Sequence, residues 1–269
     1  MGYLRLIRPV NCIIAFSAVY VGAWIGKSVI FNFQLLCAGT AAFLVCAFGN
    51  IVNDLKDIEI DRINNPHRPL PSGSASKTMT ILLAVFLFFA ASTCSFSLGL
   101  YPSLLVIGAL IMLLAYAYSF KKTVLGNFVV ALVSGLSFIL GGIITHNPVC
   151  LVPFIFSFFI HIPREILKDV MDMEGDRAGG VLSVPIIYGT VPSFRISALL
   201  LCSLCILVPV PFFMNLLGSM YLTFMVIGAY PILIFLIVQL LKNPQHKDLL
   251  RFSSLLKLVM IIGLVGMIV

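Results

Sequence analysis

The chain has 269 residues, of which 61% are hydrophobic and 10% are charged, and its mean hydropathy is +1.12. These values lie far outside the range of soluble globular domains, so the sequence predicts an integral membrane protein. The net charge of +7 implies no nucleic-acid partner, because basic loops beside anionic lipid head groups account for it.

Apolar runs long enough to cross about 30 Å of hydrocarbon predict nine membrane-spanning helices. In chain order they cover residues 10–27, 33–52, 79–99, 102–120, 124–145, 149–164, 195–215, 219–241 and 252–269. We therefore expect an all-α membrane protein in which residues 1–269 form a single transmembrane domain. The first span follows Arg5 and Arg8 as a signal peptide would, but eight further spans favour a retained anchor.

The basic residues are concentrated on one side of the predicted membrane. Of the 17 Lys and Arg residues, sixteen fall in the N-terminal segment and the even-numbered loops, where Lys257 is assigned to the eighth loop, and only Lys27 falls on the other side. The positive-inside rule then places the N-terminus in the cytoplasm and the C-terminus outside, in a multi-pass protein of the cell membrane.

Nine of the ten acidic residues fall in two short segments that repeat each other at an offset of 115 residues. In a helix, four residues of each segment would lie within an arc of about 60°. These are Asn50, Asp54, Asp57 and Asp61 in the first, and Glu165, Asp169, Asp172 and Asp176 in the second. Glu59 and Glu174 would point away, towards water or a basic neighbour. Because crowded carboxylates at a membrane boundary repel one another, a cation should lie between them.

Three kinds of cation site compete to explain these acids. A calcium loop is excluded, because Arg62 and Arg177 stand where such a loop requires glycine. A cation transporter would carry acids near the middle of its spans, whereas these acids lie at helix ends. Magnesium that bridges carboxylates to a diphosphate also explains the nearby basic residues. Such a site suits ionisation of an allylic diphosphate, since metal ions neutralise the leaving group and apolar helices keep water from the carbocation.

The two segments resemble the aspartate-rich motifs of the UbiA superfamily of intramembrane prenyltransferases. The first motif matches as Asn53-Asp54-x-x-Asp57-x-x-x-Asp61, followed by the RPLPSG stretch at 68–73, and the second as Lys168-Asp169-x-x-Asp172-x-x-x-Asp176. The resemblance covers essentially the whole chain. It implies a bundle of nine transmembrane helices around a central cavity, with Mg²⁺ as the cofactor. It also implies that one set of residues is both metal-binding and catalytic: Asp54, Asp57, Asp61, Asp169, Asp172 and Asp176.

Within that superfamily, the segments 7–11, 63–73 and 164–180 are most similar to the digeranylgeranylglyceryl phosphate synthases. This implies transfer of a geranylgeranyl group from its diphosphate to the hydroxyl of geranylgeranylglyceryl phosphate, which forms an ether lipid. The sequence departs from the pattern at Met171, where an acid is expected, and at 183–185, where Ser-Val-Pro replaces Thr-Leu-Pro. The alternatives are a UbiA-type transferase acting on an aromatic quinone precursor and, from another class, a cation transporter.

Acceptor chemistry distinguishes the two transferases. A glycerol hydroxyl loses its proton as it attacks, whereas an aromatic ring carbon loses one afterwards. A glycerophosphate acceptor also carries its own anion, so it needs an additional basic partner. Arg5, Arg8 and Arg68 are the candidates for that partner.

A second set of residues is expected to bind substrate: Asn11, Asn50, Asn53, Arg68, Tyr118, Lys121, Lys122, Glu165 and Lys168. Lys121 and Lys122 are the first choice for the diphosphate, although they would serve equally as a basic anchor at the membrane surface. Tyr118 could steady a carbocation through its ring face or lie in an interfacial belt. Asn127 is assigned to helix packing.

Overall fold

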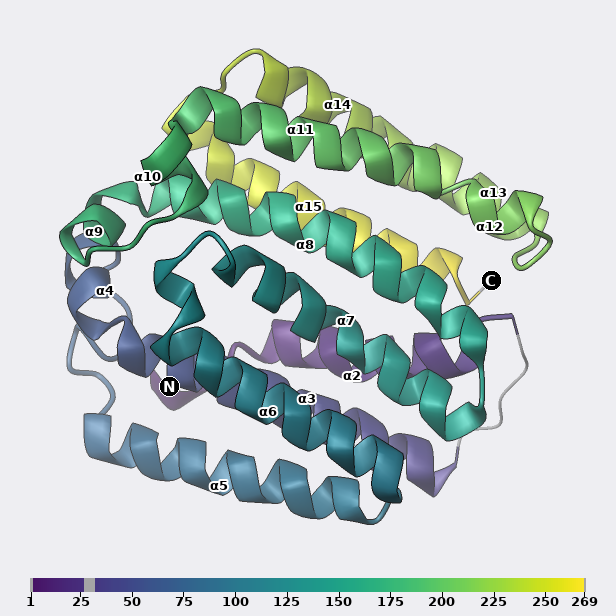
Figure 1. The fold of residues 1–269 in the computed structure, drawn as a ribbon, viewed down its shortest axis with the longest axis horizontal. Helices are drawn as coiled ribbons and strands as arrows, with labels where there is room; N and C mark the ends of the chain where they lie inside the picture. Colours follow the sequence, from purple (N-terminus) through teal and green to yellow (C-terminus); the bar gives the residue numbers. More distant parts are fainter. Residues whose placement is uncertain (1, 27–31, 269) are drawn as a thin grey trace.

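A computed structural model describes residues 2–26 and 32–268, so Lys27 lies outside the described residues. The described residues are almost entirely helical, and the long helices lie side by side along one axis (Figure 1). The long helices are α2 (Pro9–Trp24), α3 (Phe33–Lys56), α5 (Lys77–Phe96), α6 (Leu100–Tyr118), α7 (Gly126–Thr145), α8 (Leu151–Met171), α11 (Thr190–Leu207), α14 (Tyr230–Leu241) and α15 (His246–Gly266).

Short helices connect or extend the long ones. They are α1 (Gly2–Ile7), α4 (Ile58–Asn64), η1 (Phe120–Lys122), η2 (Pro148–Cys150), α9 (Met173–Ala178), α10 (Val184–Tyr188), α12 (Val210–Phe213), α13 (Ser219–Phe224) and η3 (Met225–Ala229). Eight helical segments of the described chain are long and apolar enough to cross a membrane, and α2 is a shorter apolar helix in the place of the first predicted span. The prediction of an all-α membrane protein is confirmed.

The two acidic motifs lie where a long helix bends into a short one. At Asp57, between α3 and α4, the backbone has φ −91° and ψ 3°, and at Asp172, between α8 and α9, it has φ −98° and ψ 6°. The backbone ladder continues around the first bend, since Asp61 N donates to Asp57 O at 2.7 Å. Each motif is therefore divided between two helices at its middle aspartate, and Asp54, Asp57 and Asp61 are nevertheless all buried, as the shared face predicts.

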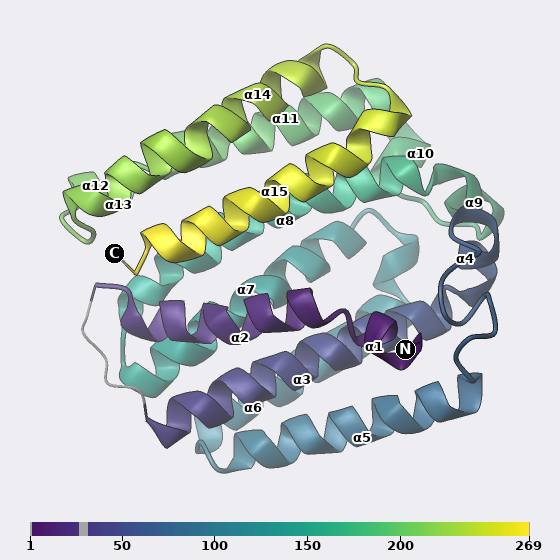
Figure 2. The same cartoon turned by 180° about the vertical axis from the view of Figure 1, so that it is seen from behind.

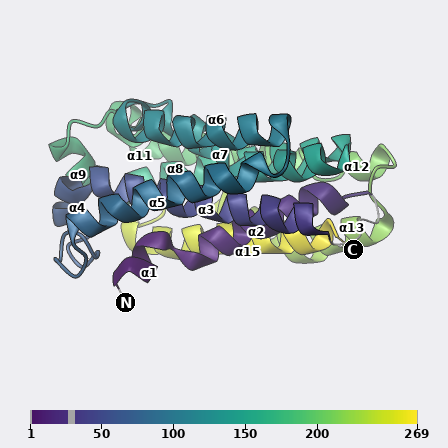
Figure 3. The same ribbon diagram turned by 90° about the horizontal axis from the view of Figure 1, so that it is seen from below.

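Both motifs lie at the same end of the bundle. The short helices α4 and α9 pack against each other there, together with η1 and the connection between α14 and α15 (Figures 1 and 2). Helix α1 also lies at this end, whereas α15 finishes at the opposite end (Figure 3). The end that carries α4 and α9 is called the motif end below.

The bundle has two halves. Helices α2, α3, α5, α6 and α7 form one, and α8, α11, α14 and α15 form the other (Figure 1). One core of buried apolar residues lies within the first half, and the other joins the second half to Ala18, Val21 and Phe138 of α2 and α7. Helix α7 packs tightly against both α2 and α8. Because lipid gives apolar helices little reason to associate, close packing at small residues holds such bundles together.

The contact between α2 and α7 depends on two glycines. A Cβ atom on Gly22 would lie 2.0 Å from the carbonyl oxygen of Phe138, and one on Gly141 would lie 1.9 Å from the carbonyl oxygen of Val19. The backbones of the two helices therefore meet with no side chain between them. This contact fixes the C-terminal part of α2 against the C-terminal part of α7.

We predict that Gly141→Ala destabilises the protein, because the new methyl group must push α2 and α7 apart at a cost of about 1–3 kcal/mol. Thermal unfolding in detergent would show this as a lower midpoint temperature. Gly108→Ala in α6 is the matched control, since a Cβ atom there meets no atom within 4 Å. Equal midpoints for the two variants would contradict the assigned helix contact.

Candidate active site

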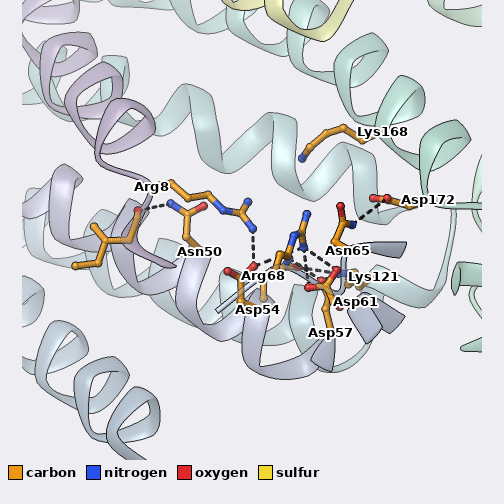
Figure 4. Close-up of polar contacts among 12 residues, drawn as sticks. Arg8, Asn50, Asp54, Asp57, Asp61, Asn65, Arg68, Lys121, Lys168 and Asp172 are labelled. Carbon is orange, nitrogen blue, oxygen red and sulfur yellow. Dashed lines mark hydrogen bonds and ion pairs between the residues drawn. The ribbon is translucent and has the colours of Figure 1, made fainter. Parts of the chain in front are cut away.

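Two aspartates of the first motif are buried and paired with arginines from outside their own helices. Asp54 lies in the last turn of α3, and its Oδ1 is 2.5 Å from Arg8 Nη2. Asp61 lies in α4, and its two carboxylate oxygens are 2.8 and 2.7 Å from Arg68 Nη1. Arg68 also approaches Asp54 Oδ1, at 3.9 Å. Figure 4 shows both guanidinium groups directed at the acids.

The middle aspartate of the first motif is paired with a lysine from η1. Lys121 Nζ forms an ion pair with Asp57 and donates a hydrogen bond to Asn53 Oδ1 at 3.0 Å. Asn53 Nδ2 in turn donates to Asp57 Oδ2 at 2.8 Å. Each aspartate of the first motif is therefore paired with one basic side chain.

In the second motif, two of the aspartates contact neutral amide side chains instead of basic ones. Asn127 Nδ2, from α7, donates to Asp169 Oδ2 at 2.8 Å, and Asn65 Nδ2 lies 3.5 Å from Asp172 Oδ1. Asn127, which the sequence assigned to helix packing, does join α7 to α8, and it does so through an acid of the motif. No sequence spacing relates these residues, since the hydrogen bonds join separate helices.

Asn64 joins the two motifs directly. Its Nδ2 donates to the carbonyl oxygen of Asp172 at 2.8 Å, and its Oδ1 accepts from the backbone N–H of Gly175 at 2.8 Å. A Cβ atom on Gly175 would lie 2.5 Å from Asn64 Nδ2, so only glycine permits this approach. The pair holds α4 against α9 and so sets the spacing between the two groups of carboxylates.

Two of the aspartates outside the membrane-spanning helices have raised pKa values. Burial raises the pKa of Asp61, although Arg68 opposes the shift. Burial, followed by the charge of nearby Asp172, raises the pKa of Asp176 to about 7. A carboxyl group with this pKa is about half protonated at neutral pH, which shows how unfavourable an unpaired negative charge is at this position.

The two acids predicted to point away from the motifs do so. Glu59 is exposed and pairs with Arg62 at 2.7 Å, and Glu174 is exposed on α9. In the described part of the chain, no three His, Cys, Asp or Glu side chains converge closely enough to hold a metal ion. The chemistry of the aspartates nevertheless suits a hard cation, since their oxygens are the ligands that Mg²⁺ prefers.

A cavity of about 280 Å³ lies between the two halves of the bundle. Its lining is mostly apolar along α2, α6, α7 and α15, with polar residues that include Asn11, Asn50, Asn53, Glu165 and Lys168. These five belong to the residues predicted to bind substrate. Lys257 also lines the cavity, although the sequence predicted it in a cytosolic loop; it lies instead within α15.

The Asn50 side chain forms a hydrogen bond with the backbone just before α2. Its Nδ2 donates to the carbonyl oxygen of Ile7 at 2.9 Å, immediately before Arg8. Arg8 has φ 55° and ψ 68° and precedes Pro9, a conformation that a residue before proline rarely adopts. The structure thus gives Asn50 a positioning role, since it fixes the backbone from which Arg8 reaches Asp54.

Two of the predicted substrate-binding residues lie away from the cavity. Tyr118 is 65% exposed, and Lys56 Nζ lies 3.3 Å from the centre of its ring. The Lys122 side chain is exposed as well. Neither position supports the predicted contact with substrate. Tyr116, which the sequence analysis missed, lines the cavity instead.

These features define a multi-pass helical protein with facing acidic motifs at one end of a largely apolar cavity. A model of the UbiA prenyltransferase family matches residues 15–260. The digeranylgeranylglyceryl phosphate synthase of Methanosphaera stadtmanae is 32% identical over 266 residues, which cover 98% of this chain and 97% of that protein. The chain belongs to the UbiA prenyltransferase family and is therefore a membrane-embedded prenyltransferase.

Solved structures have the same fold. A structure of digeranylgeranylglyceryl phosphate synthase has a TM-score of 0.76 at 34% identity, covering 99% of this chain and 96% of the other. A UbiA homologue from Archaeoglobus fulgidus, bound to DMAPP and Mg²⁺, has a TM-score of 0.71 at 22% identity and covers 99% of each chain. The resemblance to a UbiA-type bundle that the sequence indicated is confirmed.

We predict that Asn64→Ala lowers prenyl transfer by about tenfold or more, because it removes both hydrogen bonds that hold α9 against α4 and so displaces the second motif. Initial rates in detergent at saturating substrate would measure this. Asn65→Ala is the matched control, because its 3.5 Å contact with Asp172 is longer and weaker. A normal rate for Asn64→Ala would show that the two motifs keep their spacing without it.

Proposed function

We propose that the protein transfers a geranylgeranyl group from geranylgeranyl diphosphate to the free hydroxyl of geranylgeranylglyceryl phosphate. The bond between C1 of the donor and its diphosphate oxygen breaks, and a bond between C1 and the acceptor oxygen forms. The products are the digeranylgeranyl ether lipid, diphosphate and one proton. The observation that carries this proposal is the full-length similarity to the Methanosphaera stadtmanae synthase, combined with two acidic motifs over an apolar cavity.

The six aspartates of the two motifs are proposed to hold Mg²⁺. These aspartates are Asp54, Asp57, Asp61, Asp169, Asp172 and Asp176. When bound, Mg²⁺ would neutralise the charge that develops on the departing diphosphate. The Mg²⁺ and DMAPP bound to the homologue from Archaeoglobus fulgidus support this choice of ion. Asn64 keeps the two sets of carboxylates facing each other.

The basic partners of the first motif are proposed to contact the diphosphate. Arg8, Arg68 and Lys121 are already within ion-pair distance of the aspartates, so a short side-chain movement brings them to phosphate oxygens beside the same carboxylates. Arginine suits this role, because its planar fork of donors binds phosphate and carboxylate equally well. The same side chains would thus stabilise the acids before substrate binds and the diphosphate afterwards.

The cavity is proposed to receive the prenyl chain of the donor. Its apolar walls include Ala18, Phe138 and Met225, which offer no hydrogen bonds and match an isoprenoid surface. Excluding water from this space prevents hydrolysis of an allylic cation before the acceptor reaches it. The proposed domain is the whole of residues 1–269.

The proposed orientation places the motif end at the cytosolic face. The loops that carry most of the basic residues lie at that end, as do α4 and α9 (Figure 1). The positive-inside rule then gives a cytoplasmic N-terminus and an external C-terminus in the cell membrane. Water-soluble diphosphate would leave the site towards the cytosol.

An assay with labelled donor tests the reaction. Purified protein with Mg²⁺ and labelled geranylgeranyl diphosphate receives geranylgeranylglyceryl phosphate in one tube and 4-hydroxybenzoate or 1,4-dihydroxy-2-naphthoate in others. We expect label in lipid product with the glyceryl phosphate alone, and none when EDTA is present. Label on an aromatic acceptor only would replace the proposed acceptor, and label transfer that survives EDTA would remove the metal from the proposal.

We predict that Asp57→Ala and Asp172→Ala abolish turnover while the protein remains folded in detergent, since each removes the middle carboxylate of a motif. Glu59→Ala and Glu174→Ala are the matched controls, because these acids belong to the same two segments but are exposed. We expect the controls to retain most activity. Near-normal turnover in either aspartate variant would contradict a metal site built from both motifs.

A further inference from the structure

A cluster of basic residues lines the cavity where α8 packs against α15. This basic cluster consists of Arg164, Lys168 and Lys257. One carboxylate accompanies it: Glu165 Oε1 accepts from Arg164 Nη1 at 3.0 Å, and Glu165 Oε2 accepts from Lys168 Nζ at 2.7 Å. Three positive charges and one negative charge leave the group with a net charge of +2, inside a largely apolar bundle.

Part of this charge has no partner within the protein. Arg164 Nε is buried and has no hydrogen-bond acceptor, and Lys257 forms no ion pair with any described residue. Leaving such a buried donor unpaired is unfavourable, and more so for a charged group. The cavity therefore contains donors and positive charge that an anionic ligand would satisfy.

The other charged groups near Lys257 do not neutralise the excess positive charge of the basic cluster. Arg8, Arg164 and Lys168 act on Lys257 with the same sign of charge, and Glu165 alone opposes them. Arg8 is already paired with Asp54, and Glu165 is already shared by Arg164 and Lys168. A membrane-spanning helix retains an unpaired lysine only where it faces water or a polar ligand.

The proposed reaction brings two anions to the site. The donor diphosphate is assigned to the aspartate motifs and their basic partners. The acceptor phosphate is a monoester with a charge of about −1.5 to −2 at neutral pH, which matches the net charge around the basic cluster. The acceptor hydroxyl lies on the same glycerol unit as this phosphate, so the phosphate site must adjoin the motifs. Lys168 satisfies this condition, because it directly precedes Asp169 (Figure 4 shows Lys168 above the first motif).

The arginines that the sequence suggested for the acceptor phosphate suit that role less well. Arg5, Arg8 and Arg68 line a second hollow beside the loop at 64–69, and Arg8 also lines the cavity. Within the hollow, Arg8 and Arg68 are bound to Asp54 and Asp61. Binding the acceptor there would compete with the ion pairs of the first motif, whereas the basic cluster offers unpaired donors.

Resting on the proposed prenyl transfer, we propose that Arg164, Lys168 and Lys257 bind the phosphate of the lipid acceptor and thereby select a phosphorylated acceptor. Glu165 positions Arg164 and Lys168 through its two ion pairs. Lys257 supplies a charge from the other side of the cavity, on α15. The cluster is thus a specificity site for the acceptor, separate from the donor diphosphate site at the motifs.

Lipid binding without turnover tests the proposal independently of the reaction. The full chain in detergent and EDTA is titrated with geranylgeranylglyceryl phosphate and, separately, with geranylgeranylglycerol, which lacks the phosphate. We expect the wild-type protein to bind the phosphorylated lipid at least about tenfold more tightly, the effect of one charge-assisted hydrogen bond. Lys257→Met should lose about tenfold of this preference, and Lys257→Arg should keep most of it.

Lys247→Met is the matched control, because Lys247 is exposed on the same helix, and we expect it to retain the preference. Arg164→Gln replaces Lys257→Met if the latter does not fold. In the transfer assay, Lys257→Met should raise KM for the acceptor and leave kcat and KM for the donor within about twofold, since the donor diphosphate is bound elsewhere. A general loss of structure would not raise KM for the acceptor alone while leaving kcat and KM for the donor unchanged.

The two proposals fail in different ways. Selective binding of the phosphorylated lipid that is lost in Lys257→Met supports the basic cluster even if no label is transferred, in which case only the proposed reaction is wrong. Equal binding of the two lipids by the wild-type protein would overturn the basic cluster as a phosphate site. The same conclusion would follow if Lys257→Met kept the full preference.

Discussion

The cost of placing charge next to hydrocarbon governs the architecture of the motif end. An isolated buried carboxylate is strongly unfavourable, so it must be paired or protonated. Asp54, Asp57 and Asp61 are each paired with a basic side chain, and the three bases come from three different parts of the chain. Electrostatic pairing thus draws the segment before α2, the loop after α4 and η1 onto the end of α3, and it builds the site as it stabilises the fold.

The same charged residues therefore serve both the stability of the fold and the proposed catalysis. The acids proposed to bind a metal ion are kept buried by the bases proposed to bind a diphosphate, so neither set is left unpaired in the protein. The apolar cavity beneath the charged residues is proposed to hold the long prenyl chain away from water. Many apolar side chains are exposed on the outside of the bundle, where they contact the lipid of the membrane.

The sequence predicted the helices and the repeated acidic motifs well, because both are periodic patterns along one chain. It did not predict the bends at Asp57 and Asp172, since the residues there carry no proline or glycine that would mark a break. The sequence prediction named Tyr118, whereas Tyr116 lines the cavity. Residues two apart in a helix differ by about 200° in direction, and hydropathy does not say which side faces inward. Lys257 counted with the eighth loop although the predicted span 252–269 contains it, and the structure places it within α15.

The two motifs differ in what holds their carboxylates. In the first, Asp54, Asp57 and Asp61 form ion pairs with three basic side chains. In the second, Asp169 and Asp172 would release only neutral amide groups, those of Asn127 and Asn65. The proposed Mg²⁺ would therefore displace neutral partners at the second motif and basic partners at the first, and an arriving diphosphate would offer those bases a new partner.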